Sequence, residues 1–239
     1  MAEQLYTIPV NEAFDKEHEC PVCLMHREIE KNVIDFVMGP SYMEDDVRSV
    51  TDRTGFCKEH VKMVYDKNNR LGMAWIFKTH MDKLEKDISK LQKSGPAGGF
   101  LKKSGGNKLT EYLDSVCGSC YVCDRVDSTF ERYIATIFHL WKSDEDFVVK
   151  YTKSKGFCLD HYNVLLKEGE KKLGGKNKEE FISATNKVFL DNLSRVRDDV
   201  AWFINKFDYK YKDEPWKEAK DSLPRAMIKL DSFEENVRE

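Results

Sequence analysis

The chain has 239 residues, of which 41% are hydrophobic and 34% are charged, and its formal net charge is −3. This length accommodates one large domain or two modules of roughly 100 residues each. Charges of both signs are mixed along the chain, whereas a nucleic-acid-binding domain is expected to be basic. The composition therefore predicts a globular protein that does not bind nucleic acid.

The start of the chain and its cysteines indicate a compartment. Residues 1–20 have neither the basic first region nor the apolar run of a secretory signal. No stretch approaches the roughly 18 apolar residues of a membrane span. We therefore expect a cytoplasmic protein without a membrane partner. Seven cysteines in a reducing compartment are typical of metal ligands or redox groups rather than disulfides.

The first part of the chain has helical patterns throughout. After a lead-in of residues 1–19, an apolar stripe from Leu24 to Val37 predicts a helix that ends at Gly39-Pro40. The pattern then predicts a short helix over Tyr42–Val50 and another from Cys57 through Tyr65. Apolar residues from Leu71 to Leu91 recur in steps of three and four. This heptad-like seam predicts a long helix that packs on another helix.

Residues 94–108 interrupt these helical patterns. The segment reads SGPAGGFLKKSGGNK, and its five glycines and one proline are incompatible with a stable helix. We interpret it as a flexible linker or an exposed loop.

The remainder of the chain repeats the same order of predicted helices. The pattern predicts an apolar stripe over 130–141, a short helix over 147–151 and a helix over 158–166 after the next cysteine. It then predicts a long amphipathic helix over 178–207 and a last helix over 216–230 that is kinked at Pro224. No alternating pattern of strand length is present. The predicted fold is all-α, with two tandem helical modules, residues 1–93 and 109–239, on either side of the linker.

Two cysteine motifs repeat in register. C-P-V-C at residues 20–23 is followed by G-F-C-K-E-H at residues 55–60, and C-Y-V-C at residues 120–123 is followed by G-F-C-L-D-H at residues 156–161. A lone C-x-x-C is a weak signal, but this doubled combination predicts an internal duplication with one metal site in each copy.

The spacing within each copy suits a tetrahedral metal site. A C-x-x-C turn brings two sulfurs together, and Cys and His three residues apart on a helix share one face. Zn²⁺ takes this geometry with thiolate and imidazole ligands and is favoured over iron. The predicted ligands are Cys20, Cys23, Cys57 and His60 for the first site, and Cys120, Cys123, Cys158 and His161 for the second.

Cys117 breaks the symmetry of the two copies, because Glu17 stands at its position in the first. Three interpretations stay open. Cys117 is a spare thiol, or it holds an iron–sulfur cluster together with Cys120, Cys123 and Cys158, or it exchanges with a zinc ligand and makes the second site redox-responsive. His18, close to Cys20, is either a spare ligand or a solvated histidine.

The doubled motifs, the F-x₅-C-P-V-C lead-in at residues 14–23 and the terminal E-P-W-K-E-A at residues 214–219 resemble a known family. It is an uncharacterised group of duplicated Cys/His proteins from anaerobic bacteria, described as a domain of unknown function. The resemblance covers nearly the whole chain. It implies no activity, and it is compatible with an oxygen-poor cytoplasm.

The motifs favour a protein without enzymatic activity. Each predicted site has four protein ligands, whereas a catalytic zinc keeps one coordination position open. We predict a zinc-binding helical protein that acts as a binding or adaptor module, with its long helices offered to a protein partner or to a homodimer. The alternative is an iron–sulfur or thiol-based redox protein or sensor that uses the second site and Cys117.

Overall fold

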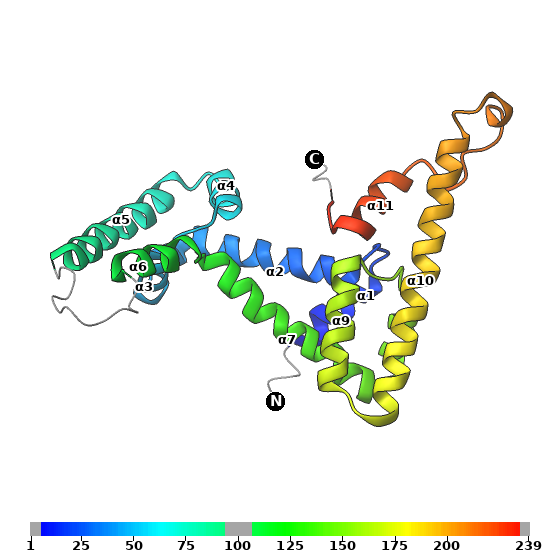
Figure 1. Cartoon of the computed structure of the whole chain (residues 1–239), viewed down its shortest axis with the longest axis horizontal. Coiled ribbons are helices and arrows are strands. Elements are labelled where there is room, and N and C mark those ends of the chain that lie inside the picture. Colours follow the sequence, from blue (N-terminus) through cyan, green and yellow to red (C-terminus); the bar gives the residue numbers. More distant parts are fainter. Residues whose placement is uncertain (1–5, 94–106, 235–239) are drawn as a thin grey trace. The chain divides into compact units, whose positions relative to one another are not determined.

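The computed structural model describes residues 6–93 and 107–234. These residues form eleven α-helices and two short 3₁₀-helices, and they contain no strand, which confirms the all-α prediction (Figure 1). The first part of the chain contains α1 (Thr7–Asp15), α2 (Pro21–Met38), η2 (Pro40–Met43), α3 (Asp45–Thr54), α4 (Lys58–Asp66) and α5 (Arg70–Lys93).

The second part repeats this order of five α-helices and then adds a 3₁₀-helix and a last α-helix. It contains α6 (Lys108–Cys117), α7 (Tyr121–Ser143), α8 (Glu145–Lys153), α9 (Leu159–Lys172), α10 (Gly175–Asn205), η3 (Tyr209–Tyr211) and α11 (Ser222–Asp231). The repeated order is compatible with an internal duplication, which stays a prediction.

Three helices differ from the sequence prediction. Helices α1 and α6, which precede the C-x-x-C motifs, were not expected, although Asn107 caps α6 by accepting a hydrogen bond from the Leu109 amide at 3.0 Å. Helix α11 begins at Ser222 rather than Trp216. Pro224 therefore lies in its first turn, where a proline removes no helical hydrogen bond and does not kink the helix.

The described residues separate into two compact units. Unit 1 combines residues 1–27 with residues 130–239, and unit 2 consists of residues 28–129. Their boundaries fall inside α2 and α7, so each unit contains segments from both predicted modules, 1–93 and 109–239. Residues 94–106 of the predicted linker lie outside the described part of the chain.

Unit 1 is built on a cluster of buried aromatic rings. Phe14 of α1 packs against Phe147 with ring centroids 5.1 Å apart, and Trp141 packs against Phe181 at 5.1 Å. Tyr151 lies between them, and its hydroxyl is 2.7 Å from the Thr185 hydroxyl, so its one polar group is satisfied. Helices α9 and α10 lie side by side in this unit (Figure 1).

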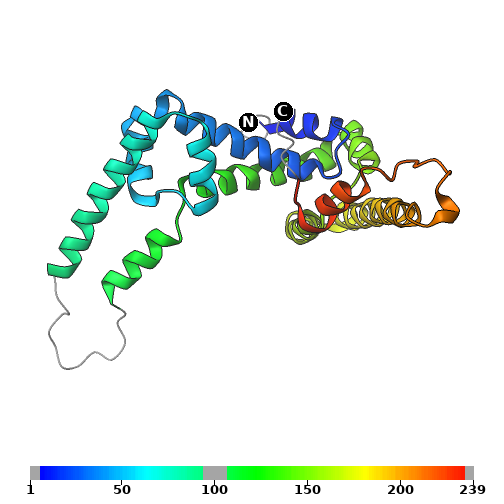
Figure 2. The same ribbon diagram turned by 90° about the horizontal axis from the view of Figure 1, so that it is seen from above.

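Unit 2 is held by close packing of α3 and α5, and α5 also contacts α6 (Figure 2). The buried face of α5 is formed by Gly72, Met73 and Ile76. Leu71 is 64% exposed and Met81 is 59% exposed, so these two members of the predicted heptad seam lie outside the buried face, whereas its later members Leu84, Ile88 and Leu91 are half-buried. Gly72 lies where α5 packs against η2, and a Cβ at this position would lie 2.9 Å from the Tyr42 ring.

Candidate metal centres

Four donor atoms converge in unit 1. We call the group Cys20, Cys23, Cys158 and His161 centre 1, and its donor atoms all lie within 4.8 Å of one another. The His161 Nδ1 atom is 3.5 Å from Cys20 Sγ, 3.3 Å from Cys23 Sγ and 3.1 Å from Cys158 Sγ. The sulfurs of Cys23 and Cys158 are 3.7 Å apart.

Unit 2 holds a second group with the same donors. Centre 2 consists of Cys57, His60, Cys120 and Cys123, again with all donor atoms within 4.8 Å. The His60 Nδ1 atom is 3.2 Å from Cys57 Sγ and 3.3 Å from each of the other two sulfurs. The sulfurs of Cys57 and Cys123 are 4.0 Å apart.

These distances fit one tetrahedral cation in each centre. Zinc bonds of about 2.3 Å to sulfur and about 2.0 Å to nitrogen place two sulfurs about 3.8 Å apart, and a sulfur and a nitrogen about 3.5 Å apart. The observed separations lie close to both values. Three thiols and one imidazole in such a cage are a donor set suited to a thiophilic metal ion.

The pairing of the motifs differs from the sequence prediction. Cys20 and Cys23 were expected to share a site with Cys57 and His60, but each C-x-x-C pair meets the G-F-C-x-x-H segment of the other copy. Helix α2 begins at Pro21, between Cys20 and Cys23, in unit 1 and continues into unit 2, so the segment that follows it contributes to centre 2. Helix α7 returns the chain to unit 1.

The local backbone positions the ligands as the motifs require. Cys57 and Cys158 are the N-cap residues of α4 and α9, and the Cys158 sulfur accepts a hydrogen bond from the His161 amide at 3.4 Å. Gly55 and Gly156 precede these helices with positive φ angles of 56° and 86°. Most residues with a side chain avoid this conformation, which explains the glycine of each G-F-C motif.

Crowding of the donors perturbs their protonation. Cys23 donates its thiol hydrogen to Cys158, which raises the pKa of Cys23, and hydrogen bonds from the thiols of Cys20 and Cys23 lower the pKa of Cys158. In centre 2, burial and the Cys120 hydrogen bond raise the pKa of Cys123 to about 12. Burial opposes ionisation of Cys57, but hydrogen bonds from the His60 amide and Cys120 lower its pKa to about 7. Neighbouring thiols cannot all ionise together unless a cation compensates their charge.

The immediate surroundings of the two imidazoles differ. In centre 2, the His60 Nε2 atom is 3.0 Å from the Glu30 carboxylate, which orients Nδ1 toward the sulfurs. In centre 1, the His161 ring lies 5.5 Å from the Phe130 ring, and the Ser232 hydroxyl donates a hydrogen bond to Cys158 Sγ at 3.1 Å. The sequence offered no signal for Glu30 or Ser232, because neither belongs to a ligand motif.

A comparison with known families decides where the chain belongs. A family described as one of unknown function, DUF6062, matches residues 1–236. The chain belongs to this family. No curated protein and no solved structure matches the sequence. Throughout residues 6–93 and 107–234, each helix is too short or too polar to cross a membrane.

Two further residues that the sequence offered as possible metal ligands, Cys117 and His18, lie outside both centres. Cys117 is exposed at the end of α6 and belongs to neither group. The predicted iron–sulfur quartet is wrong, because Cys158 lies in centre 1 whereas Cys120 and Cys123 lie in centre 2. His18 is not a spare ligand: its Nδ1 atom accepts a hydrogen bond from the Cys20 amide at 3.0 Å.

Proposed function

We propose that this protein is a zinc-binding, non-enzymatic helical protein with two structural Cys₃His sites, and that it acts as a binding or adaptor module in the cytoplasm. The single observation that supports this most is the complete four-donor set in each compact unit. Four protein ligands saturate a tetrahedral ion, which is the property of structural rather than catalytic zinc.

The ligands connect segments that are distant in sequence, and this connection gives the metal a structural role. Centre 1 joins the start of α2 to the start of α9, and centre 2 joins the start of α4 to the start of α7. A metal ion that cross-links such segments binds only the folded chain, so its binding free energy contributes directly to folding.

The loop after α10 supports a binding role. The Lys206 ammonium donates hydrogen bonds to the carbonyl oxygens of Tyr211 at 2.6 Å and Lys212 at 2.9 Å, which fixes the loop around it. Phe207 is 77% exposed and Tyr209 is 83% exposed on this ordered loop. Exposed aromatic residues on a pre-organised loop are favourable contact residues for a protein partner.

Metal analysis of the purified full-length protein tests the proposal. We expect two equivalents of zinc per chain, and we expect a strong chelator to reduce helicity in a cooperative transition. Each structural site contributes on the order of 10 kcal/mol to folding. Unchanged circular dichroism in protein shown to be metal-free would contradict the structural role.

The second candidate function, a thiol-based redox protein or sensor, rests on the exposure of three cysteines. Cys117 is exposed, and Cys57 and Cys123 of centre 2 are partly exposed, whereas every cysteine of centre 1 is buried. Zinc release under oxidant distinguishes the candidates, since reversible oxidation of exposed ligand thiols frees the metal of centre 2, whereas a purely structural site should keep it. The redox function also requires that Cys117→Ser changes metal loss under oxidant.

A further inference from the structure

The two ligand loops of centre 2 are joined directly to each other. The Tyr121 amide donates a hydrogen bond to the Gly55 carbonyl at 3.0 Å. The Ser119 hydroxyl donates to the Thr54 carbonyl, also at 3.0 Å. These two bonds hold the C-x-x-C loop against the G-F-C loop, so the geometry of centre 2 is fixed by its own motifs.

Centre 1 cannot form the same bridge. In the register of the two motifs, Pro21 stands where Tyr121 stands, and Glu19 stands where Ser119 stands. A proline has no amide hydrogen to donate. A glutamate side chain that is ionised accepts hydrogen bonds and donates none, so it cannot replace the hydroxyl of Ser119. The loops of centre 1 therefore need a donor from elsewhere.

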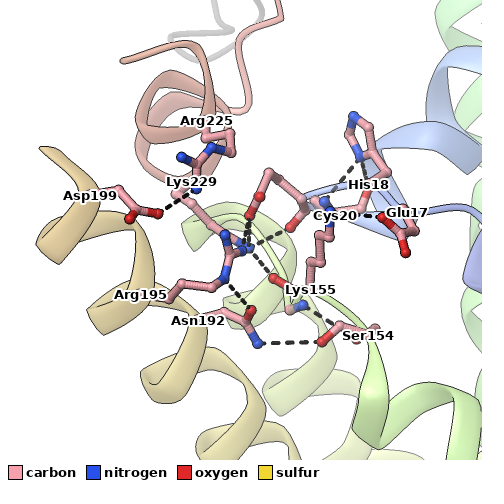
Figure 3. A network of polar contacts seen from close by, with 12 residues as sticks. Glu17, His18, Cys20, Ser154, Lys155, Asn192, Arg195, Asp199, Arg225 and Lys229 are labelled. Carbon is pink, nitrogen blue, oxygen red and sulfur yellow. Dashed lines mark hydrogen bonds and ion pairs between the residues drawn. The ribbon is translucent and has the colours of Figure 1, made fainter. Parts of the chain in front are cut away.

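Lys229 of α11 supplies that donor (Figure 3). Its ammonium donates hydrogen bonds to the Glu19 carbonyl at 2.5 Å and to the Lys155 carbonyl. Glu19 immediately precedes Cys20, and Lys155 occupies the position of Thr54 in the other copy. One side chain thus bridges both ligand loops of centre 1.

The bridging ammonium is buried and paired. The Lys229 side chain is 1% exposed, and its nitrogen lies 3.1 Å from the Glu19 carboxylate. Arg195 of α10 binds the same carboxylate at 2.6 Å. A charge placed in the interior is costly unless it is paired and hydrogen-bonded. The position of Lys229 is therefore strongly determined by the loops that it contacts.

The rest of α11 is fixed at both ends. Near its start, Arg225 forms an ion pair with Asp199 of α10 at 2.8 Å. At its end, Ser232 has a positive φ of 55° and directs its hydroxyl to Cys158 Sγ at 3.1 Å. Among the described residues, α1–α5 and α6–α10 follow the same order, and α11 is an additional element.

We propose that α11 is a clasp for centre 1: Lys229 positions both ligand loops, Ser232 binds a ligand sulfur, and the docking of α11 controls how firmly centre 1 retains its metal. Centre 2, which has its own internal bridge, does not depend on α11. This inference rests on the proposed function, because it presumes that centre 1 holds a metal ion.

The test measures zinc release from full-length protein into a chromogenic chelator, one centre at a time. Cys123→Ser removes centre 2 and leaves centre 1 to be observed, and Cys23→Ser does the reverse. Lys229→Met is added to each background. Loss of a side chain that supports metal ligands typically weakens metal affinity by roughly 10- to 100-fold. We expect release from centre 1 to accelerate by that order and release from centre 2 to stay unchanged.

Two further variants make the result decisive. Lys220→Met alters an exposed lysine just before α11 and serves as the matched control. Ser232→Ala removes only the hydroxyl that donates a hydrogen bond to Cys158 Sγ. We expect this variant to accelerate zinc release from centre 1 by a smaller factor than Lys229→Met. It also provides the test if Lys229→Met does not fold.

Unchanged release from centre 1 in both Lys229→Met and Ser232→Ala, or equal acceleration at both centres, would overturn the clasp, as would the same acceleration in the Lys220→Met control. Wild-type protein that binds no zinc would instead contradict the proposed function on which the clasp rests.

Discussion

Units 1 and 2 present the same four donors in different surroundings. Centre 1 has three buried cysteines and lies in the unit that contains the aromatic core, whereas Cys57 and Cys123 of centre 2 are partly exposed. Centre 2 joins its loops through backbone and hydroxyl donors, and centre 1 uses Lys229 from another helix. The difference teaches that a ligand motif specifies the donors, while the surrounding chain determines how firmly they are held.

The largest expected difference between the units appears when metal is removed. Unit 1 keeps a cluster of aromatic rings that buries apolar surface without help from a metal, so we expect it to retain part of its structure. We expect unit 2 to depend more on centre 2 and to lose its structure together with its metal, because metal binding at a structural site contributes on the order of 10 kcal/mol of stability. Hydrogen exchange after chelation should show loss of protection in α3–α5 and retained protection in α8 and α10. Equal loss in both sets of helices would contradict this comparison.

The aromatic core of unit 1 offers the next largest effect. Phe181 is fully buried and contacts Phe138, Trp141 and Tyr151. Phe181→Ala should lower the free energy of unfolding of unit 1 by about 3–5 kcal/mol. The matched control is Phe207→Ala, because Phe207 is 77% exposed and its removal should change stability by less than about 0.5 kcal/mol. Urea unfolding of the metal-loaded proteins measures both, and similar values for the two variants would disprove the assignment of the core.

Alanine substitutions of Gly55 and Gly156 test how strictly the backbone of each ligand loop requires a glycine. Both have positive φ, so an alanine at either position is strained by about 1–2 kcal/mol. A Cβ on Gly156 would also lie 3.2 Å from the Val188 backbone oxygen, whereas on Gly55 it would meet the His80 side chain at 2.9 Å. A side chain can move aside more readily than a helix backbone. We expect Gly156→Ala to lower the thermal midpoint more than Gly55→Ala, and the reverse order would show that His80 is the less adaptable neighbour.

The smallest of these effects concerns the carboxylate behind His60. Glu30→Gln removes the negative charge beside the imidazole of centre 2, so zinc affinity there should fall by roughly tenfold, which is about 1.4 kcal/mol. Glu28→Gln, an exposed change on the same helix, is the control. Competition with a chelator of known affinity measures both variants. An unchanged affinity in Glu30→Gln would mean that this contact does not support the ligand.

The helical class was predictable from the sequence because it depends on local patterns, and the convergence of the candidate ligands depends in part on local spacing too. All eight predicted ligands lie in the two groups, and the turns and caps that place them extend over only a few residues. The pairing was not predictable in the same way, since it depends on α2 and α7 passing from one unit to the other. The periodicity of apolar residues predicts that a segment is helical, but it does not predict which other segments lie near the end of that helix.

The supporting residues were beyond sequence reasoning for a related reason. Lys229 looks like one of many helix lysines, and its role arises from contact with loops that are far away in the chain. The sequence pattern predicts a start of α11 at Trp216, whereas residues 216–221 form an irregular segment with two turns before the helix begins at Ser222. Pro224, which was interpreted as a kink, lies in the first turn of the helix.

The exchanged pairing of the motifs is the central claim, and two double variants test it directly by metal content. Cys23→Ser with Cys158→Ser alters only centre 1, so this protein should retain one equivalent of zinc in the presence of a mild competing chelator. Cys23→Ser with Cys57→Ser alters both centres and should retain none. If each copy instead built its own site, the first protein would hold no zinc and the second would hold one equivalent, and that result would contradict the account.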